Sequence, residues 1–262
     1  MIGYTRVALK AYSNEEYAKP DGIGLYFDLL HPGGGTAPLV VFLHGGGWIS
    51  GDRTMYSEEA EWFVSQGFAA AVIDYRLAPL YPFPSAVVDA QSFVRHVREN
   101  AGRYGVDAGR IAAMGNSAGG HLACMLGVCR DGFGSGDCIP VNAVVDVCGL
   151  TDVRDPSESQ YPISMSFVEQ FLGGPHLGRE ALYASASPLT HVGAGAPPFL
   201  IVHGSADDVV PPSQSQSLHD ALTAVGASSR LLMLQDEGHS FTLEAWERIR
   251  TESVSFLKGA LS

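Results

Sequence analysis

The sequence predicts an α/β fold with a mostly parallel central sheet flanked by helices. Two observations indicate this architecture. Short apolar runs, typical of strands, alternate along the chain with longer amphipathic segments. The 262 residues, of which 46% are hydrophobic and 17% charged, are enough for one large core and exclude disordered and fibrous classes. We therefore expect a single domain over residues 1–262.

The strands of this sheet can be assigned in order from the apolar runs. Two early strands are expected near the N-terminus, and the later runs are short and apolar, as buried parallel strands are. The assigned runs are Arg6 to Tyr12, Leu25 to Leu30, Pro38 to Leu43, Ala69 to Asp74, Arg110 to Met114, Ala143 to Val147, Phe199 to Val202 and Arg230 to Leu234.

Two helices are expected where apolar residues recur in steps of three and four. The first has Pro84 in its first turn, a position where proline is tolerated. Its stripe consists of Phe83, Val87, Ala90, Val94, Val97 and Ala101, and the last segment repeats the pattern with Phe241, Ala245, Ile249 and Phe256.

Charge and hydropathy limit the partners. The 16 Lys and Arg residues against 28 Asp and Glu give a net charge of -12, which repels nucleic acid and makes neutral substrates the natural expectation. No apolar run is long enough to span a bilayer, and Met1 to Glu15 lacks the pattern of a secretory signal. We expect no membrane association and a cytoplasmic location, or secretion if a leader has been removed.

The four cysteines do not have the spacing of a metal site, so we expect no metal. Cys129 and Cys138 flank a glycine-rich loop and would be able to pair in an oxidising compartment, whereas free, buried thiols are the favoured alternative. The cysteines are Cys124, Cys129, Cys138 and Cys148.

The stretch Gly115-Asn116-Ser117-Ala118-Gly119-Gly120 has the G-x-S-x-G pattern of a nucleophile elbow. Such a pentapeptide alone is often an ordinary turn in a chain with 31 glycines. Its context favours the elbow, because a predicted strand precedes it and the apolar helical segment Ala118 to Val128 follows. This order places the serine hydroxyl at a sharp turn, where it is exposed and able to attack a substrate.

A second glycine-rich stretch, His44-Gly45-Gly46-Gly47-Trp48, follows the apolar run Leu39 to Leu43. Backbone without side chains can approach a substrate closely and direct N–H groups at a developing oxyanion. The two stretches together predict an enzyme that catalyses acyl transfer.

A serine nucleophile needs a histidine base, and the histidine needs a carboxylate that orients it. Downstream of Ser117, Asp207 follows one predicted strand and His239 follows the next. Both residues are expected at the carboxyl edge of the sheet, where catalytic groups of open α/β sheets gather. Asp208 is the alternative to Asp207, and the spacing to Val210-Pro211 favours Asp207.

Other polar residues near these motifs have structural interpretations. His121 and His203 are expected to be hydrogen-bonded packing residues rather than bases. Asp74 and Arg76 are expected to form an ion pair that braces a tight turn beneath the site.

The chain resembles the α/β-hydrolase esterases related to hormone-sensitive lipases, and within them the compact bacterial feruloyl and acetylxylan esterases. The resemblance covers nearly the whole chain. It implies Ser117 as nucleophile, Asp207 as orienting acid and His239 as base, with the N–H groups of Gly46, Gly47 and Ala118 as oxyanion hole. It also implies that His44 braces the oxyanion loop. The matching motifs are the His44 to Trp48 run with Gly51-Asp52-Arg53, Asp74 to Pro79, Gly115 to Ala123, His203 to Pro211 and Gly238-His239.

Substrate contacts are expected from a small cap. Because only 43 residues precede His44, fewer than these relatives use for an N-terminal cap, the cap is expected from an insertion at about residues 151–190, after the sixth strand. Four aromatic residues either line an acyl or alcohol pocket or pack the insertion. They are Trp48, Tyr161, Phe167 and Phe171.

The predicted function is hydrolysis of short-acyl carboxylic esters by a serine esterase, with acetyl or feruloyl esters of carbohydrates as candidate substrates and no cofactor. An open cleft would favour acetyl to butyryl groups over long chains, with Trp48 stacking on a ring of the alcohol. The alternatives are an N-formylkynurenine formamidase and a non-catalytic receptor of this fold, against which His239 argues. The sequence leaves a monomer and a homodimer both open.

Overall fold

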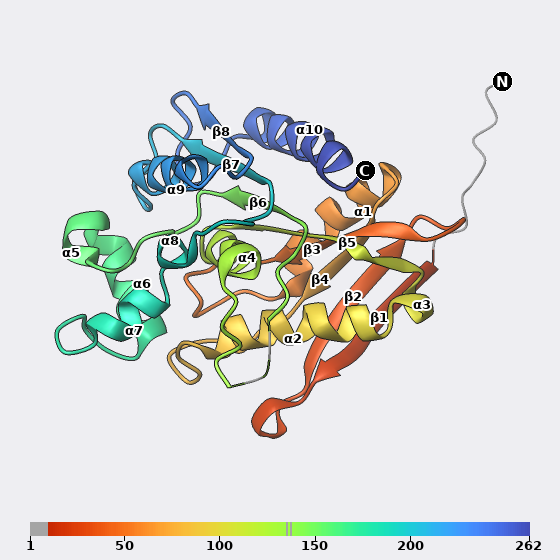
Figure 1. Cartoon of the computed structure of the whole chain (residues 1–262), viewed down its shortest axis with the longest axis horizontal. Helices are drawn as coiled ribbons and strands as arrows, with labels where there is room; N and C mark the ends of the chain where they lie inside the picture. Colours follow the sequence, from red (N-terminus) through yellow and green to blue (C-terminus); the bar gives the residue numbers. More distant parts are fainter. Residues whose placement is uncertain (1–9, 135, 137) are drawn as a thin grey trace.

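A computed structural model describes residues 10–134, 136 and 138–262, and this part of the chain forms an eight-stranded sheet (Figure 1). The strand order is β1-β2-β4-β3-β5-β6-β7-β8. Strands β1 and β2 are antiparallel to their neighbours, whereas the pairs from β4 and β3 through β7 and β8 are parallel. The predicted α/β fold with a mostly parallel sheet is therefore confirmed.

The observed strands overlap the predicted runs, with β6 matching at both ends. The predicted first strand begins within residues 1–9, which lie outside the described residues, and the observed strand continues to Ala18. The fifth strand begins at Val106, earlier than predicted. The strands are β1 Lys10–Ala18, β2 Leu25–His31, β3 Ala37–Leu43, β4 Ala69–Ile73, β5 Val106–Asn116, β6 Ala143–Val147, β7 Phe199–Gly204 and β8 Ser229–Leu234.

Helices cover both faces of the sheet (Figure 1). The sequence of β3 is continuously apolar because both faces of this strand are buried. Val41 and Leu43 belong to the core on one face, and Val40 and Phe42 belong to the core on the other. The first core includes α2 (Ser85–Glu99), α4 (Ala118–Val128) and α9 (Ser213–Ala224), and the second includes α1 (Ser57–Ser65) and α10 (Leu243–Ala260). The short elements η1 (Pro20–Gly22), η2 (Arg53–Tyr56) and α3 (Ala101–Tyr104) lie in connections.

The first predicted helix differs in its ends. Pro84 is the residue before the helix rather than part of its first turn, and the helix begins at Ser85. The bond between Phe83 and Pro84 is cis, and the Phe83 ring packs on Phe171 and Phe133. The middle of the predicted stripe, Val87, Ala90, Val94 and Val97, is buried as expected.

The ion pair predicted between Asp74 and Arg76 is wrong. Asp74 accepts hydrogen bonds from the backbone N–H and the guanidinium of Arg53. Arg76 instead pairs with buried Asp89 on α2 at 2.8 Å and with Asp21 at 2.7 Å. The partners of both residues are distant in the sequence, so packing between elements rather than local spacing decides the ion pairs.

The insertion after β6 folds into short helices at one end of the sheet (Figure 1). They are α5 (Pro156–Ser159), α6 (Pro162–Leu172), α7 (Glu180–Ser185) and α8 (Pro188–His191). The interpretation of residues 1–262 as one domain with a cap stays a prediction.

All four cysteines have free thiols; Cys124, Cys129 and Cys148 are buried and Cys138 is half-buried. Among the residues that the structure describes, no helix has the length and apolar character needed to cross a bilayer.

Candidate functional site

Ser117 lies in a strained turn between β5 and α4. Its φ of 54° and ψ of -121° are unusual for a residue with a side chain, and its N–H donates to the Val147 carbonyl at 2.9 Å. The flanking glycines are required by space: a Cβ on Gly115 would lie 2.3 Å from the Gly119 oxygen, and one on Gly119 would lie 2.0 Å from the Leu43 oxygen. The tight crossing of chains therefore explains the glycine spacing around the serine.

The structure brings Ser117, His239 and Asp207 together at the carboxyl edge of the sheet. His239 follows β8, and its Nε2 accepts a hydrogen bond from the Ser117 hydroxyl at 3.1 Å. The other ring nitrogen, Nδ1, donates to Asp207 Oδ2 at 2.8 Å. Asp208, the alternative carboxylate, is exposed to solvent, whereas Asp207 is buried. The arrangement can therefore pass a proton between Ser117 and His239 while Asp207 orients the ring.

Asp207 is held by more donors than His239 alone. The N–H groups of Val209 and Val210 donate to its Oδ1 at 2.9 and 2.8 Å. His203 Nε2 lies 3.1 Å from its Oδ2. Burial acts to raise the pKa of Asp207, but hydrogen bonds from His203, His239 and Val210 outweigh burial and place the pKa well below its usual value. This carboxyl group is thus ionised at neutral pH.

The glycine-rich stretch after β3 turns toward Ser117. Gly46 and Gly47 have φ values of 106° and 61°, and a Cβ on Gly46 would lie 2.3 Å from the Ser50 oxygen. Ala118 is the first residue of α4, so its N–H has no acceptor within the helix. The three predicted oxyanion donors, at Gly46, Gly47 and Ala118, therefore lie on the two backbone segments that meet at the serine.

His44 contacts the glycine-rich loop. Its ring stacks on Tyr75 with centroids 4.2 Å apart, and its Nδ1 donates to the Gly45 carbonyl at 2.8 Å. Tyr75 in turn donates to the His44 carbonyl at 2.8 Å. Burial lowers the pKa of His44, so the ring is neutral at pH 7. These contacts agree with a bracing role.

A cavity of about 370 Å³ opens beside Ser117 and His239. Its walls are mostly apolar, and the only ionisable side chain among its lining residues is His239. Such a lining suits a neutral substrate. Sequence reasoning missed several of the lining residues, which come from five separate segments: Met55, Asn116, Leu150, Ile163, Ser164, Val209 and Val210.

The four predicted aromatic residues have different environments. Phe167 lines the cavity next to Gly47. Trp48 also borders the cavity, but the residue is 1% exposed and its ring stacks on Phe171 with centroids 4.2 Å apart. The expectation that Trp48 stacks on a ring of the substrate is therefore wrong. Phe171 is a packing residue, buried against Trp48 and Phe83. Tyr161 is 39% exposed at the start of α6 and is not among the lining residues.

His121 links the same loop to the insertion. Trp48 Nε1 donates to His121 Nδ1 at 3.2 Å, and His121 Nε2 donates to the Ala186 carbonyl at 2.8 Å. Burial lowers the pKa of His121 to about 4, so the ring is neutral. His121 is thus a hydrogen-bonded packing residue, as predicted.

One group of side chains near the serine has the composition of a metal site. Ligand atoms of Cys148, Asp207 and His239 lie within 4.8 Å of one another. Burial, however, raises the pKa of the Cys148 thiol well above its usual value, and metals bind the thiolate. Asp207 and His239 are already hydrogen-bonded to each other. The donor set therefore fits a hydrogen-bonded relay better than a metal.

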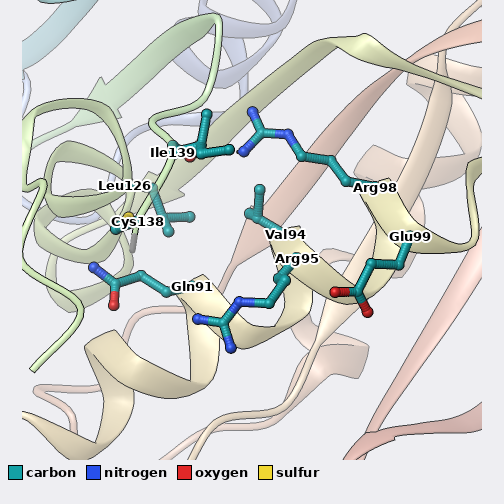
Figure 2. Close-up of a pocket in the computed structure, with 8 residues that line it drawn as sticks. All are labelled: Gln91, Val94, Arg95, Arg98, Glu99, Leu126, Cys138 and Ile139. Carbon is teal, nitrogen blue, oxygen red and sulfur yellow. Dashed lines mark hydrogen bonds between the residues drawn. The ribbon is translucent and has the colours of Figure 1, made fainter. Parts of the chain in front are cut away.

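A second cavity, of about 200 Å³, lies between α2, α4 and the segment before β6 (Figure 2). Val94 and Leu126 form apolar parts of its wall, and Arg95, Arg98 and Cys138 also line it. Figure 2 shows the Arg98 guanidinium beside Ile139, where it donates to the carbonyls of Ile139 and Pro140 at 2.7 and 2.9 Å.

The sheet order and the strand–turn–helix around Ser117 define an α/β-hydrolase fold. The chain belongs to the BD-FAE family, whose model matches residues 27–222.

Among curated proteins, the chain is similar to esterase LipC of Mycobacterium tuberculosis, with 33% identity over 79% of this chain and 54% of LipC. It is also similar to esterase LipQ of the same organism, with 32% identity over 87% of this chain and 56% of LipQ. The chain thus spans about half the length of the curated relatives it matches.

Among solved structures, esterase 2 of Thermogutta terrifontis phosphonylated by sarin superposes with a TM-score of 0.84 and 26% identity, covering 98% of this chain and 97% of that one. The same esterase has structures with propionate and with butyrate bound.

Proposed function

We propose that the chain is a serine hydrolase of carboxylic esters with short acyl groups. The observation that carries the proposal is the hydrogen-bonded series from Ser117 through His239 to Asp207, which lies against a mostly apolar cavity. The similar proteins LipC, LipQ and Thermogutta esterase 2 are named esterases. A non-catalytic role is disfavoured, because binding alone does not need a base 3.1 Å from the serine hydroxyl.

The mechanism follows from the positions of the protons. His239 Nε2 removes the proton of Ser117 as Oγ attacks the ester carbonyl, and Asp207 stabilises the imidazolium that forms. The oxyanion is stabilised by the N–H groups of Gly46, Gly47 and Ala118. His239 then protonates the leaving alcohol, and water repeats the cycle on the acyl-enzyme. These residues complete the cycle without a cofactor.

We propose the insertion at about residues 151–190 as a small cap over one side of the cavity. Helix α6 supplies Ile163, Ser164 and Phe167 to the wall. The propionate and butyrate complexes of Thermogutta esterase 2 support a preference for short acyl groups. The resemblance to feruloyl and acetylxylan esterases makes acetyl and feruloyl esters of carbohydrates the first natural substrates to test.

Initial rates on a panel of esters test the function. The panel contains aryl esters of graded acyl length, a feruloyl ester, acetylated xylan and N-formylkynurenine, with Ser117→Ala as the control. We expect turnover of short-acyl esters and a serine-directed phosphonate adduct on Ser117 by mass spectrometry. Turnover of N-formylkynurenine alone would assign an amidase instead, and a phosphonate on another residue would overturn the proposed nucleophile.

A further inference from the structure

His203 is a fully buried histidine next to the proposed relay. It lies in β7, four residues before Asp207, and its Nε2 is 3.1 Å from Asp207 Oδ2 and 3.0 Å from the Val210 carbonyl. Its Nδ1 is 2.7 Å from the hydroxyl of Ser215, a buried residue in the first turn of α9. Both ring nitrogens therefore have partners.

These partners define where the proton of the neutral ring must be. The carboxylate and the carbonyl near Nε2 can only accept hydrogen bonds, so Nε2 carries the hydrogen. Nδ1 is then an acceptor, and Ser215 donates its hydroxyl hydrogen to it. The hydroxyl of Ser215 thus holds the His203 ring in the tautomer that faces Asp207.

Beside the hydrogen bond from His239, Asp207 Oδ2 consequently has the Nε2–H of His203, which it shares with the Val210 carbonyl. His239 donates at 2.8 Å and His203 lies at 3.1 Å, while backbone N–H groups occupy Oδ1. A second donor on the same oxygen restrains the rotation of the carboxylate. It also withdraws negative charge from that oxygen, which makes the carboxylate a weaker acceptor for His239.

We propose that His203, oriented by Ser215, is a positioning residue that sets both the direction and the basicity of Asp207 toward His239. The inference rests on the proposed function, since it assigns a role within that relay. His203 is not among the cavity-lining residues and does not contact Ser117, and it reaches the site through Asp207 and through Val210, whose N–H also binds Asp207.

Other ionisable groups face this region from neighbouring elements. They are Asp146 in β6, Cys148 after it and Cys124 in α4, together with His239 from the loop after β8. Burial raises the pKa of Asp146 to about 6 and the pKa values of both thiols well above their usual range. The variants below leave all of these groups in place, so differences between variants report on His203.

The first test does not depend on turnover. In protein labelled with ¹⁵N-histidine, NMR should show His203 protonated at Nε2 and unprotonated at Nδ1, with Ser215→Ala shifting the Nδ1 resonance. A ring protonated at Nδ1 would overturn the assignment. Because this experiment observes the resting protein, it separates the inference from the proposed function, which absence of ester turnover in the wild type would contradict.

The second test uses matched substitutions. His203→Leu removes the donor, and we expect a fall in kcat of about 10- to 100-fold, the cost of a hydrogen bond to a charged group, with KM little changed. Asp207 without this donor is more basic and favours protonated His239, so the acid limb of the rate profile should move to higher pH. His203→Gln, whose Nε2 can still donate, should recover much of kcat and return the acid limb toward the wild type.

Two further variants keep the test decisive. Ser215→Ala should shift the acid limb in the same direction by a smaller amount, and it serves if His203→Leu does not fold. His219→Leu is the matched control, because His219, on the helix that carries Ser215, forms a similar pair with Ser229 of β8 at 2.9 Å rather than with Asp207. A fall in kcat with an unmoved acid limb, or equal loss in the Gln and Leu variants, would show that His203 is only a packing residue.

Discussion

The cavity beside Ser117 and the cavity beside α2 differ in the state of their polar groups. Beside Ser117, the backbone holds several residues at positive φ, and the serine, the histidine and the loop N–H groups converge on one space. Beside α2, the Arg98 guanidinium, which lies next to Ile139 in Figure 2, already donates hydrogen bonds to the carbonyls of Ile139 and Pro140. Both cavities have apolar walls. Available polar groups and strained backbone therefore mark a candidate site better than a cavity alone does.

The largest expected effect is on Ser117. Ser117→Ala should lower kcat/KM for an aryl acetate by more than about a thousand-fold, because only the serine supplies the nucleophile. The melting temperature should change little, since alanine keeps the side-chain Cβ and removes only the hydroxyl that faces His239. A variant that keeps more than a tenth of the wild-type rate would remove Ser117 from its proposed role.

The adjacent acids give the next largest contrast. Asp207→Asn should lower kcat by about 10³- to 10⁴-fold, because His239 loses the charge that stabilises its imidazolium. Asp208→Asn is the matched control and should change kcat little, since Asp208 is exposed. Steady-state kinetics on both variants decide the assignment, and a larger loss in Asp208→Asn would reverse it.

Acyl length tests the shape of the Ser117 cavity. Its volume of about 370 Å³ and its exposed rim residues Met55 and Ile163 leave little room to enclose a long chain. Each methylene contributes only about 0.8 kcal/mol, and only where water is excluded. We expect kcat/KM to peak between acetyl and butyryl and to collapse by decanoyl. Phe167→Ala should move the optimum toward longer chains, and a wild-type maximum at octanoyl or beyond would contradict this cavity shape.

Substitution of Arg98 tests whether the cavity beside α2 contributes to stability rather than to catalysis. Arg98→Ala removes the donors to Ile139 and Pro140 and should lower the free energy of unfolding by about 1–3 kcal/mol. The rate per folded molecule should stay within about two-fold of wild type, because no relay residue is touched. Urea unfolding and kinetics measure the two quantities separately. A large loss of kcat at unchanged stability would show that the cavity beside α2 contributes to catalysis and would contradict this prediction.

The last predicted effect concerns Asp146 and the dependence of stability on pH. Burial raises its pKa to about 6, compared with about 4 in an unfolded chain. The folded state therefore binds this proton more tightly, and the resulting stability is complete below about pH 4 and lost as the pH rises through about 6. We compare the free energy of unfolding of Asp146→Asn with that of the wild type. The difference should favour the variant by about 2 kcal/mol more at pH 8 than at pH 4. Thermal melts at both values measure this, and an equal difference at the two would contradict it.

The sequence by itself determined the sheet and the strand–turn–helix that carries Ser117. Strand periodicity and the G-x-S-x-G spacing are local properties, because backbone twist and close packing act over a few neighbouring residues. The run from β5 into α4 and the positions of Asp207 and His239 after β7 and β8 were therefore predictable.

Only the tertiary structure decided which side chains meet. Asp74 pairs with Arg53 rather than Arg76, and Trp48 stacks on Phe171 instead of facing a substrate. His203, predicted as a packing residue, reaches Asp207, and its place at the end of a strand just before the acid was the only signal in the sequence. The physical reason is that these contacts join segments distant in the chain, and side-chain direction at such crossings is set by packing between elements rather than by local sequence.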